Sequence, residues 1–189
     1  MYSNFTVILD ACVLYPAPIR DLLLQLASRG LFRARWTKKI EEEWVFNLLK
    51  NRPDLTRQQL ERTCELMRAS ILDCLVEDYE DLSEGIKLPD PDDLHILAAA
   101  IKVQAQVIVT SNLKDFPKEI LYRYGIEVQD PDTFLRHQIS LYLPEFLFCI
   151  KSIRSRLKKP PKNATEYLFD LYSHLPQTVN VLKDYSDLI

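Results

Sequence analysis

The feature that most constrains the fold is the alternation of short apolar runs with longer amphipathic segments. Residues 5–9 form an apolar run that ends at Asp10, and residues 107–109 form a second one. Such short and wholly apolar runs are typical of strands that are buried on both faces of a sheet. The segments between them carry apolar residues at helical spacing, for example Leu22 and Leu26. The sequence therefore predicts an α/β fold, a parallel sheet flanked by helices.

Turn and capping residues place the remaining elements. Gly30 stands where a left-handed helix cap is expected, and Thr56 with Gln59 has the spacing of a capping box. We expect a brief extended segment at 32–36, helices at 38–49, 57–76, 88–102 and from 130, and a last strand at 126–128.

The character of the chain changes near its C-terminal quarter. Pro144 begins another apolar helix, and residues 158–162, which contain two prolines, have the composition of a linker. We predict a main α/β domain at 1–140 and a helical C-terminal extension at 141–189.

Composition excludes several classes of protein. The 189 residues suit one domain with an appendage. The three glycines, Gly30, Gly85 and Gly125, lie too far apart for a dinucleotide fingerprint or a Walker phosphate loop. The four cysteines form no CxxC pair and do not cluster with the three histidines, so neither a disulfide scaffold nor a zinc finger is expected.

The sequence gives no sign of a membrane segment. No apolar stretch approaches the roughly 18 residues that a spanning helix needs, and no basic leader precedes Asp10. We therefore expect a cytoplasmic, reduced protein.

Basic residues gather near the C-terminal end although the net charge is -3. Residues 151–162 include six lysines and arginines, and no acid lies between Glu145 and Glu166. Such a run suits a polyanion, and the end of a solvated helix explains it equally well. Lys151, Arg154 and Arg156 are the candidate contacts to such a polyanion.

Acidic and amide side chains follow the predicted strands. Asp10 comes directly after the first strand, and Asn112 and Asp115 follow the strand at 107–109. Ligands of open α/β sheets bind at the carboxyl ends of the strands. Asp93 at a helix start and the helical run at 41–43 add further acids.

Converging carboxylates repel one another unless a cation lies among them. A set of oxygen ligands suits Mg²⁺ or Mn²⁺ rather than zinc. Such an ion lowers the pKa of a bound water and stabilises charge that develops on a phosphodiester. The pattern therefore favours metal-dependent phosphodiester hydrolysis.

Structural roles also explain some of these acids. Asp90, which precedes Pro91, suits a helix N-cap, and Asp93 suits a first helical turn. Asp115 suits a turn, and of the three glutamates at 41–43 only one can point into a cleft. Asp10 has no evident cap or turn to serve.

Four motifs in this order resemble the PIN domain, in particular its VapC-type toxin branch. They are LDACVLYPAP, EEEW, DPDDLHILAAAI and VIVTSNLKDFP, within residues 5–135. The resemblance implies a parallel sheet with flanking helices and an acidic cluster that binds Mg²⁺ or Mn²⁺ for RNA cleavage. It places the site at Asp10, Glu43, Asp93 and Asn112, with Asp115 as an additional acid. It also implies a homodimer, a small cognate antitoxin and a basic tail like the C-terminal extension of longer members.

Our main hypothesis is a metal-dependent endoribonuclease, the toxin of a type II toxin–antitoxin system. Asp10, Glu43 and Asp93 hold the metal, and Asn112 and Asp115 complete its shell or position water. Ser111, at the end of a predicted strand, is a candidate contact to substrate phosphate.

Two departures from the family pattern leave alternatives open. Cys12 stands where the family usually has a polar residue, and Asn112 is neutral where many relatives have aspartate. These residues motivate a catalytically weak PIN-like module that binds a protein partner or RNA. A phosphatase of the haloacid dehalogenase type is a third hypothesis, although Cys12 stands where its second aspartate belongs.

Overall fold

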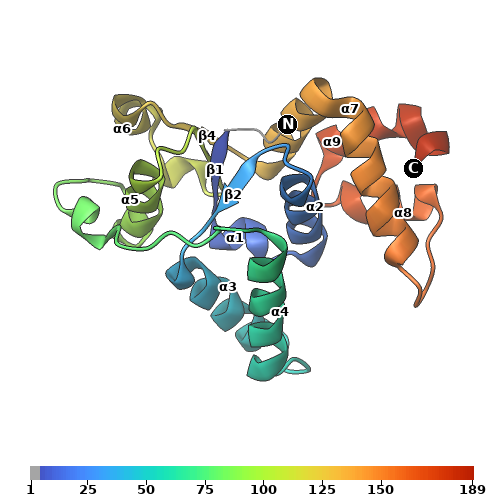
Figure 1. Cartoon of the computed structure of the whole chain (residues 1–189), viewed down its shortest axis with the longest axis horizontal. Coiled ribbons are helices and arrows are strands. Elements are labelled where there is room, and N and C mark those ends of the chain that lie inside the picture. Colours follow the sequence, from blue (N-terminus) through green and yellow to red (C-terminus); the bar gives the residue numbers. More distant parts are fainter. Residues whose placement is uncertain (1–4) are drawn as a thin grey trace.

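A four-stranded parallel sheet forms the centre of the computed structural model, which describes residues 5–189 (Figure 1). Its strands are β1 (Thr6–Leu9), β2 (Arg33–Arg35), β3 (Val107–Val109) and β4 (Glu127–Gln129), in the order β2-β1-β3-β4. The two predicted apolar runs are the central pair, β1 and β3, and every residue in them is buried. Burial on both faces is why these strands lack the polar alternation of a half-exposed strand.

Helices cover both sides of the sheet (Figure 1). The helix α2 (Ala17–Ser28) packs with α7 (Pro131–Arg156) on one side, and α5 (Leu94–Lys102) contacts β1 and β3. The helices are α1 (Ala11–Leu14), α2 (Ala17–Ser28), α3 (Lys38–Asn51), α4 (Arg57–Ser70), α5 (Leu94–Lys102), α6 (Lys118–Leu121), α7 (Pro131–Arg156), α8 (Ala164–Tyr172) and α9 (Pro176–Leu182). The predicted α/β class, with its parallel sheet flanked by helices and its C-terminal helices, is confirmed.

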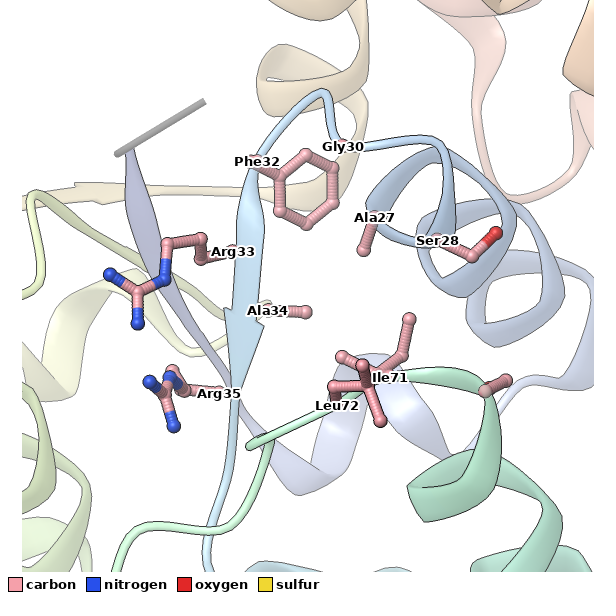
Figure 2. A pocket seen from close by; sticks show the side chains of 10 residues that line it. Ala27, Ser28, Gly30, Phe32, Arg33, Ala34, Arg35, Ile71 and Leu72 are labelled. Carbon is pink, nitrogen blue, oxygen red and sulfur yellow. The ribbon is translucent and has the colours of Figure 1, made fainter. Parts of the chain in front are cut away.

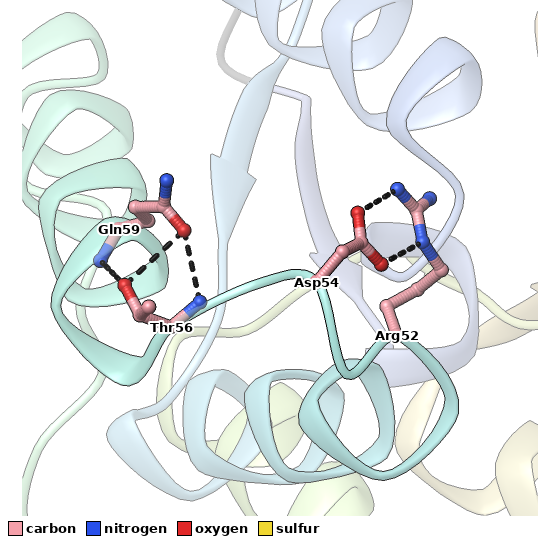
Figure 3. Close-up of polar contacts among 4 residues, drawn as sticks. All are labelled: Arg52, Asp54, Thr56 and Gln59. Atoms are coloured by element: carbon pink, nitrogen blue, oxygen red, sulfur yellow. Dashed lines mark hydrogen bonds and ion pairs between the residues drawn. The ribbon is translucent and has the colours of Figure 1, made fainter.

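Local signals in the sequence were accurate at several helix ends. Gly30, in the turn between α2 and β2, has a φ of 81°, the left-handed conformation expected of a glycine cap (Figure 2). At the start of α4, the backbone N–H of Gln59 donates to Thr56 Oγ1 over 3.3 Å (Figure 3). In return, Gln59 Oε1 accepts from the Thr56 backbone N–H over 2.9 Å, so the predicted capping box is present.

Two predicted helix boundaries were wrong. The helix expected at 57–76 ends at Ser70, and the chain then runs beside the end of β2. There the backbone N–H of Trp36 donates to Cys74 O, and the backbone N–H of Val76 donates to Trp36 O. Apolar spacing alone did not distinguish these extended residues from a further helical turn. The helix expected at 88–102 begins later, with a 3₁₀ turn at Pro91–Asp93 and α5 at Leu94.

The C-terminal region begins with a bent helix. The predicted helices before and after Pro144 are joined in α7, which has non-helical angles at Tyr142 (φ -140°, ψ 46°). Proline has no N–H to donate, so a bend at this point is expected. The proposed division between residues 140 and 141 lies close to the bend and stays a prediction. Within residues 5–189 no helix has the length and apolarity needed to cross a bilayer.

A buried carboxylate on α7 accepts hydrogen bonds from the N-terminus of α9. Asp132, in the first turn of α7, is 5% exposed. Its Oδ2 accepts from the Gln177 N–H and its Oδ1 from the Thr178 N–H, each over 2.8 Å. These two amides belong to the first turn of α9, whose own N-cap residue, Leu175, has no capping side chain. Asp132 therefore caps a helix 45 residues away in sequence.

We expect Asp132→Ala to lower the free energy of unfolding by about 2 kcal/mol, because two amides lose their acceptors. For a protein of this size that loss corresponds to a fall in Tm of about 4–8 °C. Thermal unfolding followed by circular dichroism measures it, with exposed Glu145→Ala on the same helix as the matched control. Equal Tm values for the two variants would contradict a capping role.

Candidate functional site

A cavity of about 430 Å³ lies at the carboxyl end of β1. Four of the predicted site residues line it from four separate segments of the chain: Asp10, Glu43, Asp93 and Asn112. We call this space the acidic cavity. Strands β1 and β3 pair in parallel with Leu9 opposite Val109, so the residues that follow each strand emerge side by side. Helix α3 and the turn before α5 supply Glu43 and Asp93.

Asp10 is the most deeply placed acid, with 4% of its surface exposed. It occupies the N-cap position of α1, yet its side chain makes no capping bond. Instead, its Oδ2 accepts hydrogen bonds from Thr110 Oγ1 over 2.6 Å and from Cys12 Sγ over 3.0 Å. The expectation that the Asp10 side chain serves no cap is confirmed, because its carboxylate bonds to Thr110 and Cys12 instead.

The thiol of Cys12 acts as a hydrogen-bond donor to Asp10. Burial, followed by the charge of Asp10, raises the pKa of Cys12 to about 12. The thiol therefore keeps its proton at neutral pH and can donate it. Its sulfur also accepts from the Ser111 backbone N–H over 3.2 Å. The departure from the family pattern at Cys12 thus retains a donor beside the first acid.

Of the three consecutive glutamates, only Glu43 lines the acidic cavity. Glu41 is buried, where it accepts from Trp36 Nε1 over 2.9 Å and from Arg68 Nη1 over 2.8 Å. Glu42 is exposed. This division agrees with the expectation that one of the three can enter a cleft.

Asp93 carries the clearest electrostatic sign of crowding. Its pKa is raised to about 6, first by burial and then by the charges of Asp10, Asp90 and Asp115. Asp90 itself accepts from the Asp92 N–H over 2.9 Å, which confirms its predicted capping role. The cluster thus holds more negative charge than its surroundings compensate.

His95, in α5, is a buried neighbour of Glu43. It is 6% exposed, and its Nε2 lies 3.0 Å from Glu43 Oε1. The contact is close but is not aligned as a hydrogen bond. His95 therefore packs against Glu43.

Thr110 is the site residue whose role sequence reasoning missed. It is fully buried, donates to Asp10, and its Oγ1 accepts from the Asn112 N–H over 3.0 Å. The only signal in the sequence was a hydroxyl at the end of a predicted strand. Its bond to Asp10 joins residues 100 positions apart, which no local pattern indicates.

Two other predicted residues lie at the margin of the cavity. Asp115 belongs to the 3₁₀ turn Leu113–Asp115 and does not line the cavity, although its charge acts on Asp93. Ser111 is exposed and does not line the cavity either. Their roles stay predictions.

The predicted basic contacts lie on the C-terminal half of α7, away from α3 and α5 (Figure 1). Arg154 donates to Lys162 O over 2.9 Å and Arg156 donates to Gln25 Oε1 over 2.6 Å. Lys151 donates to Leu188 O over 3.4 Å. None of the three lines the acidic cavity, and their contact with RNA stays a prediction.

A second cavity, of about 390 Å³, opens beside the edge strand β2 (Figure 2). It contains no predicted site residue. Its two arginines, Arg33 and Arg35, form ion pairs with Asp73. Its charges are therefore engaged within the protein.

The oxygen atoms around the acidic cavity suit a hard divalent cation as ligands. Four carboxylates and three amides line the cavity, and they include the oxygen ligands that Mg²⁺ and Mn²⁺ prefer at Asp10, Glu43, Asp93 and Asn112. Burial and then the charges of neighbouring carboxylates raise the pKa of Asp93, and a cation would relieve that crowding. Among residues 5–189, however, no three histidine, cysteine, aspartate or glutamate side chains form a ready metal-binding group. The residues fit the ion by chemistry and by their shared cavity.

Comparison with known proteins agrees with this arrangement. Residues 6–114, more than half of the chain, match the PIN domain family. The chain belongs to the PIN domain family. Residues 131–184 match the VapC50 C-terminal domain. Membership of the PIN family contradicts the phosphatase hypothesis.

One curated relative is described as "Putative ribonuclease VapC50" of Mycobacterium tuberculosis. This chain is 39% identical to it over 85 residues, which cover 45% of this chain and 50% of the relative. The match thus spans half the length of that relative. No solved structure matches the chain.

We expect Asp93→Asn to stabilise the metal-free protein at neutral pH. The pKa of Asp93 is higher in the folded protein, about 6, than its ordinary value of 3.8, so protonation favours folding. The wild type then loses stability as pH rises from about 4 to above 6, and the amide variant escapes this loss. Because the side chain is partly solvated, we expect about 1 kcal/mol, or a rise in Tm of about 2–4 °C.

Thermal unfolding in EDTA between pH 5 and pH 8 measures this difference. The matched control is Asp187→Asn, a change at an exposed acid that does not line the cavity. A wild-type Tm that is flat across this range, or an equal effect of the two substitutions, would contradict crowding at Asp93.

Proposed function

We propose that this protein is a Mg²⁺- or Mn²⁺-dependent endoribonuclease that acts as the toxin of a type II toxin–antitoxin system. The observation that supports the proposal most is the convergence of Asp10, Glu43 and Asp93 on one cavity. These acids come from distant segments of a PIN domain, and a relative carries a ribonuclease name.

In this proposal Asp10, Glu43 and Asp93 hold the metal, and Asn112 contributes a neutral oxygen. Asp115 acts on the cluster by its charge or positions water. A bound Mg²⁺ or Mn²⁺ supplies water activation and stabilises charge that develops on the phosphodiester. The overall reaction is hydrolysis of an RNA phosphodiester.

The protein's own contribution is to fix these acids before substrate arrives. Thr110 and Cys12 donate to the same oxygen of Asp10, which restricts rotation of its carboxylate. His95 lies against Glu43 and limits the space behind it. Groups that orient a ligand in this way commonly affect metal affinity or activity 10–100-fold.

The proposed partners follow from the relative and from the family. RNA is the substrate, a small cognate antitoxin protein silences the enzyme, and the toxin forms a homodimer in the cytoplasm. The match of residues 131–184 to the VapC50 C-terminal domain supports placement in this branch. A role for Lys151, Arg154 and Arg156 in holding RNA remains part of this proposal.

The alternative is a catalytically weak module that binds RNA or a protein. Cys12 was one reason for it, and the bond from its thiol to Asp10 removes part of that reason. The neutral side chain of Asn112 remains in its favour. Cleavage by purified protein distinguishes the two functions.

We expect the purified protein to cleave RNA from a panel of single-stranded and structured molecules with Mn²⁺ or Mg²⁺, and not with EDTA. Asp93→Asn and Glu43→Gln should each reduce the rate at least ~100-fold, because each removes a charged metal ligand. Glu42→Gln, next to Glu43 but outside the cavity, is the matched control and should cleave normally. Cleavage in EDTA, or equal rates for the two glutamate variants, would contradict the proposal.

Thr110→Val tests whether the orientation of Asp10 matters. Valine keeps the shape of threonine but cannot donate to Asp10, so we expect Mn²⁺ affinity to fall about 10–100-fold. Isothermal titration calorimetry measures the affinity, and exposed Thr165→Val on α8 serves as the control. Unchanged affinity in a folded Thr110→Val protein would show that the bond is dispensable.

A further inference from the structure

Beyond Glu43, two uncharged residues of α3 continue the lining of the acidic cavity. Glu43, Asn47 and Asn51 are spaced four residues apart, which places them on one face of the helix over successive turns. All three line the same cavity. Each step of four residues advances ~6 Å along the helix axis. The two asparagines therefore extend the wall that begins at the metal-binding acid.

Tyr15 lies beside Asn51 in this region. It follows α1, the helix that Asp10 begins, and it also lines the cavity. Its hydroxyl accepts a hydrogen bond from Asn51 Nδ2 over 3.2 Å. Tyr15, Asn47 and Asn51 thus form a continuous polar surface, which we call the amide end of the cavity.

The charge of the amide end decides what it can bind. No lysine or arginine lines the cavity. Arg52, the residue after Asn51, is held by Asp54 through two hydrogen bonds of 2.8 and 2.6 Å (Figure 3). A phosphate group is usually held by cations, whereas amides offer both donors and acceptors, as nucleobase edges do. A tyrosine ring adds a face on which a base can stack.

We propose that Tyr15, Asn47 and Asn51 bind the base of a nucleotide next to the scissile phosphate and set the base preference of cleavage. This inference rests on the proposed ribonuclease function. The scissile phosphate lies at Asp10, Glu43 and Asp93, and the neighbouring base enters the amide end one or two helical turns away. The substrate is single-stranded at this point, because a paired base has its hydrogen-bonding edge occupied.

The test uses a pool of single-stranded RNA oligonucleotides with randomised bases, cleaved in Mn²⁺ and sequenced at the cut ends. The variants are Asn47→Ala, Asn51→Ala and Tyr15→Phe, compared with wild type. Asn180→Ala, at an exposed asparagine on α9, is the matched control. We expect the ratio of rates for the best and worst base at one flanking position to fall ~5-fold or more in the asparagine variants. The control should keep the wild-type ratio.

An unchanged base profile in both asparagine variants would overturn the inference, even if all cleavage slowed. If a variant cleaves too slowly for its base profile to be measured, Asp93→Asn is added to it and to wild type so that the RNA stays intact. The affinities of these proteins for favoured and disfavoured oligonucleotides are then compared in EDTA by fluorescence anisotropy. Loss of the difference in affinity supports the inference and its persistence overturns it. Absence of metal-dependent cleavage by wild type would instead contradict the proposed function, and is therefore a separate outcome.

Discussion

Parallel pairing of β1 with β3 is the constraint on which the site depends. Leu9 lies opposite Val109, so Asp10 and Thr110 leave the sheet side by side. The hydroxyl of Thr110 then reaches the carboxylate of Asp10, and the Ser111 backbone N–H reaches the sulfur of Cys12. A shift of one residue in this register would separate Asp10 from Thr110.

We expect the acids that converge here to cost the protein stability when no cation is present. Burial, followed by neighbouring charge, raises the pKa of Asp93. Burial also raises the pKa of Glu41, two residues before Glu43, but its carboxylate accepts hydrogen bonds from Trp36 Nε1 and Arg68. These partners distinguish Glu41 from Glu43. Glu41 is satisfied inside the fold, whereas Glu43 and Asp93 face a cavity that lacks basic side chains. Unrelieved charge of this kind is common at functional sites.

Much of the fold was predictable because its strands are short, apolar and buried, and its helices carry strong caps such as Thr56 with Gln59. The candidate site residues were also recognisable, since Asp10 and Asn112 follow strands and Asp93 begins a helix. Contacts between distant segments were not predictable. The bond from Thr110 to Asp10 and the contact of His95 with Glu43 depend on register and helix packing. The amide end of the cavity has a local signal in the sequence, because Glu43, Asn47 and Asn51 are four residues apart on α3. That spacing indicates a shared helical face, but it does not reveal that the face lines a cavity.

The central claim is that Asp10, Glu43 and Asp93 surround one divalent cation. The most direct measurement is anomalous X-ray diffraction from crystals of the protein grown or soaked with Mn²⁺. The account predicts an anomalous peak within coordination distance of oxygens from all three carboxylates. A Mn²⁺ peak elsewhere, with these carboxylates apart and without metal at saturating concentration, would contradict it.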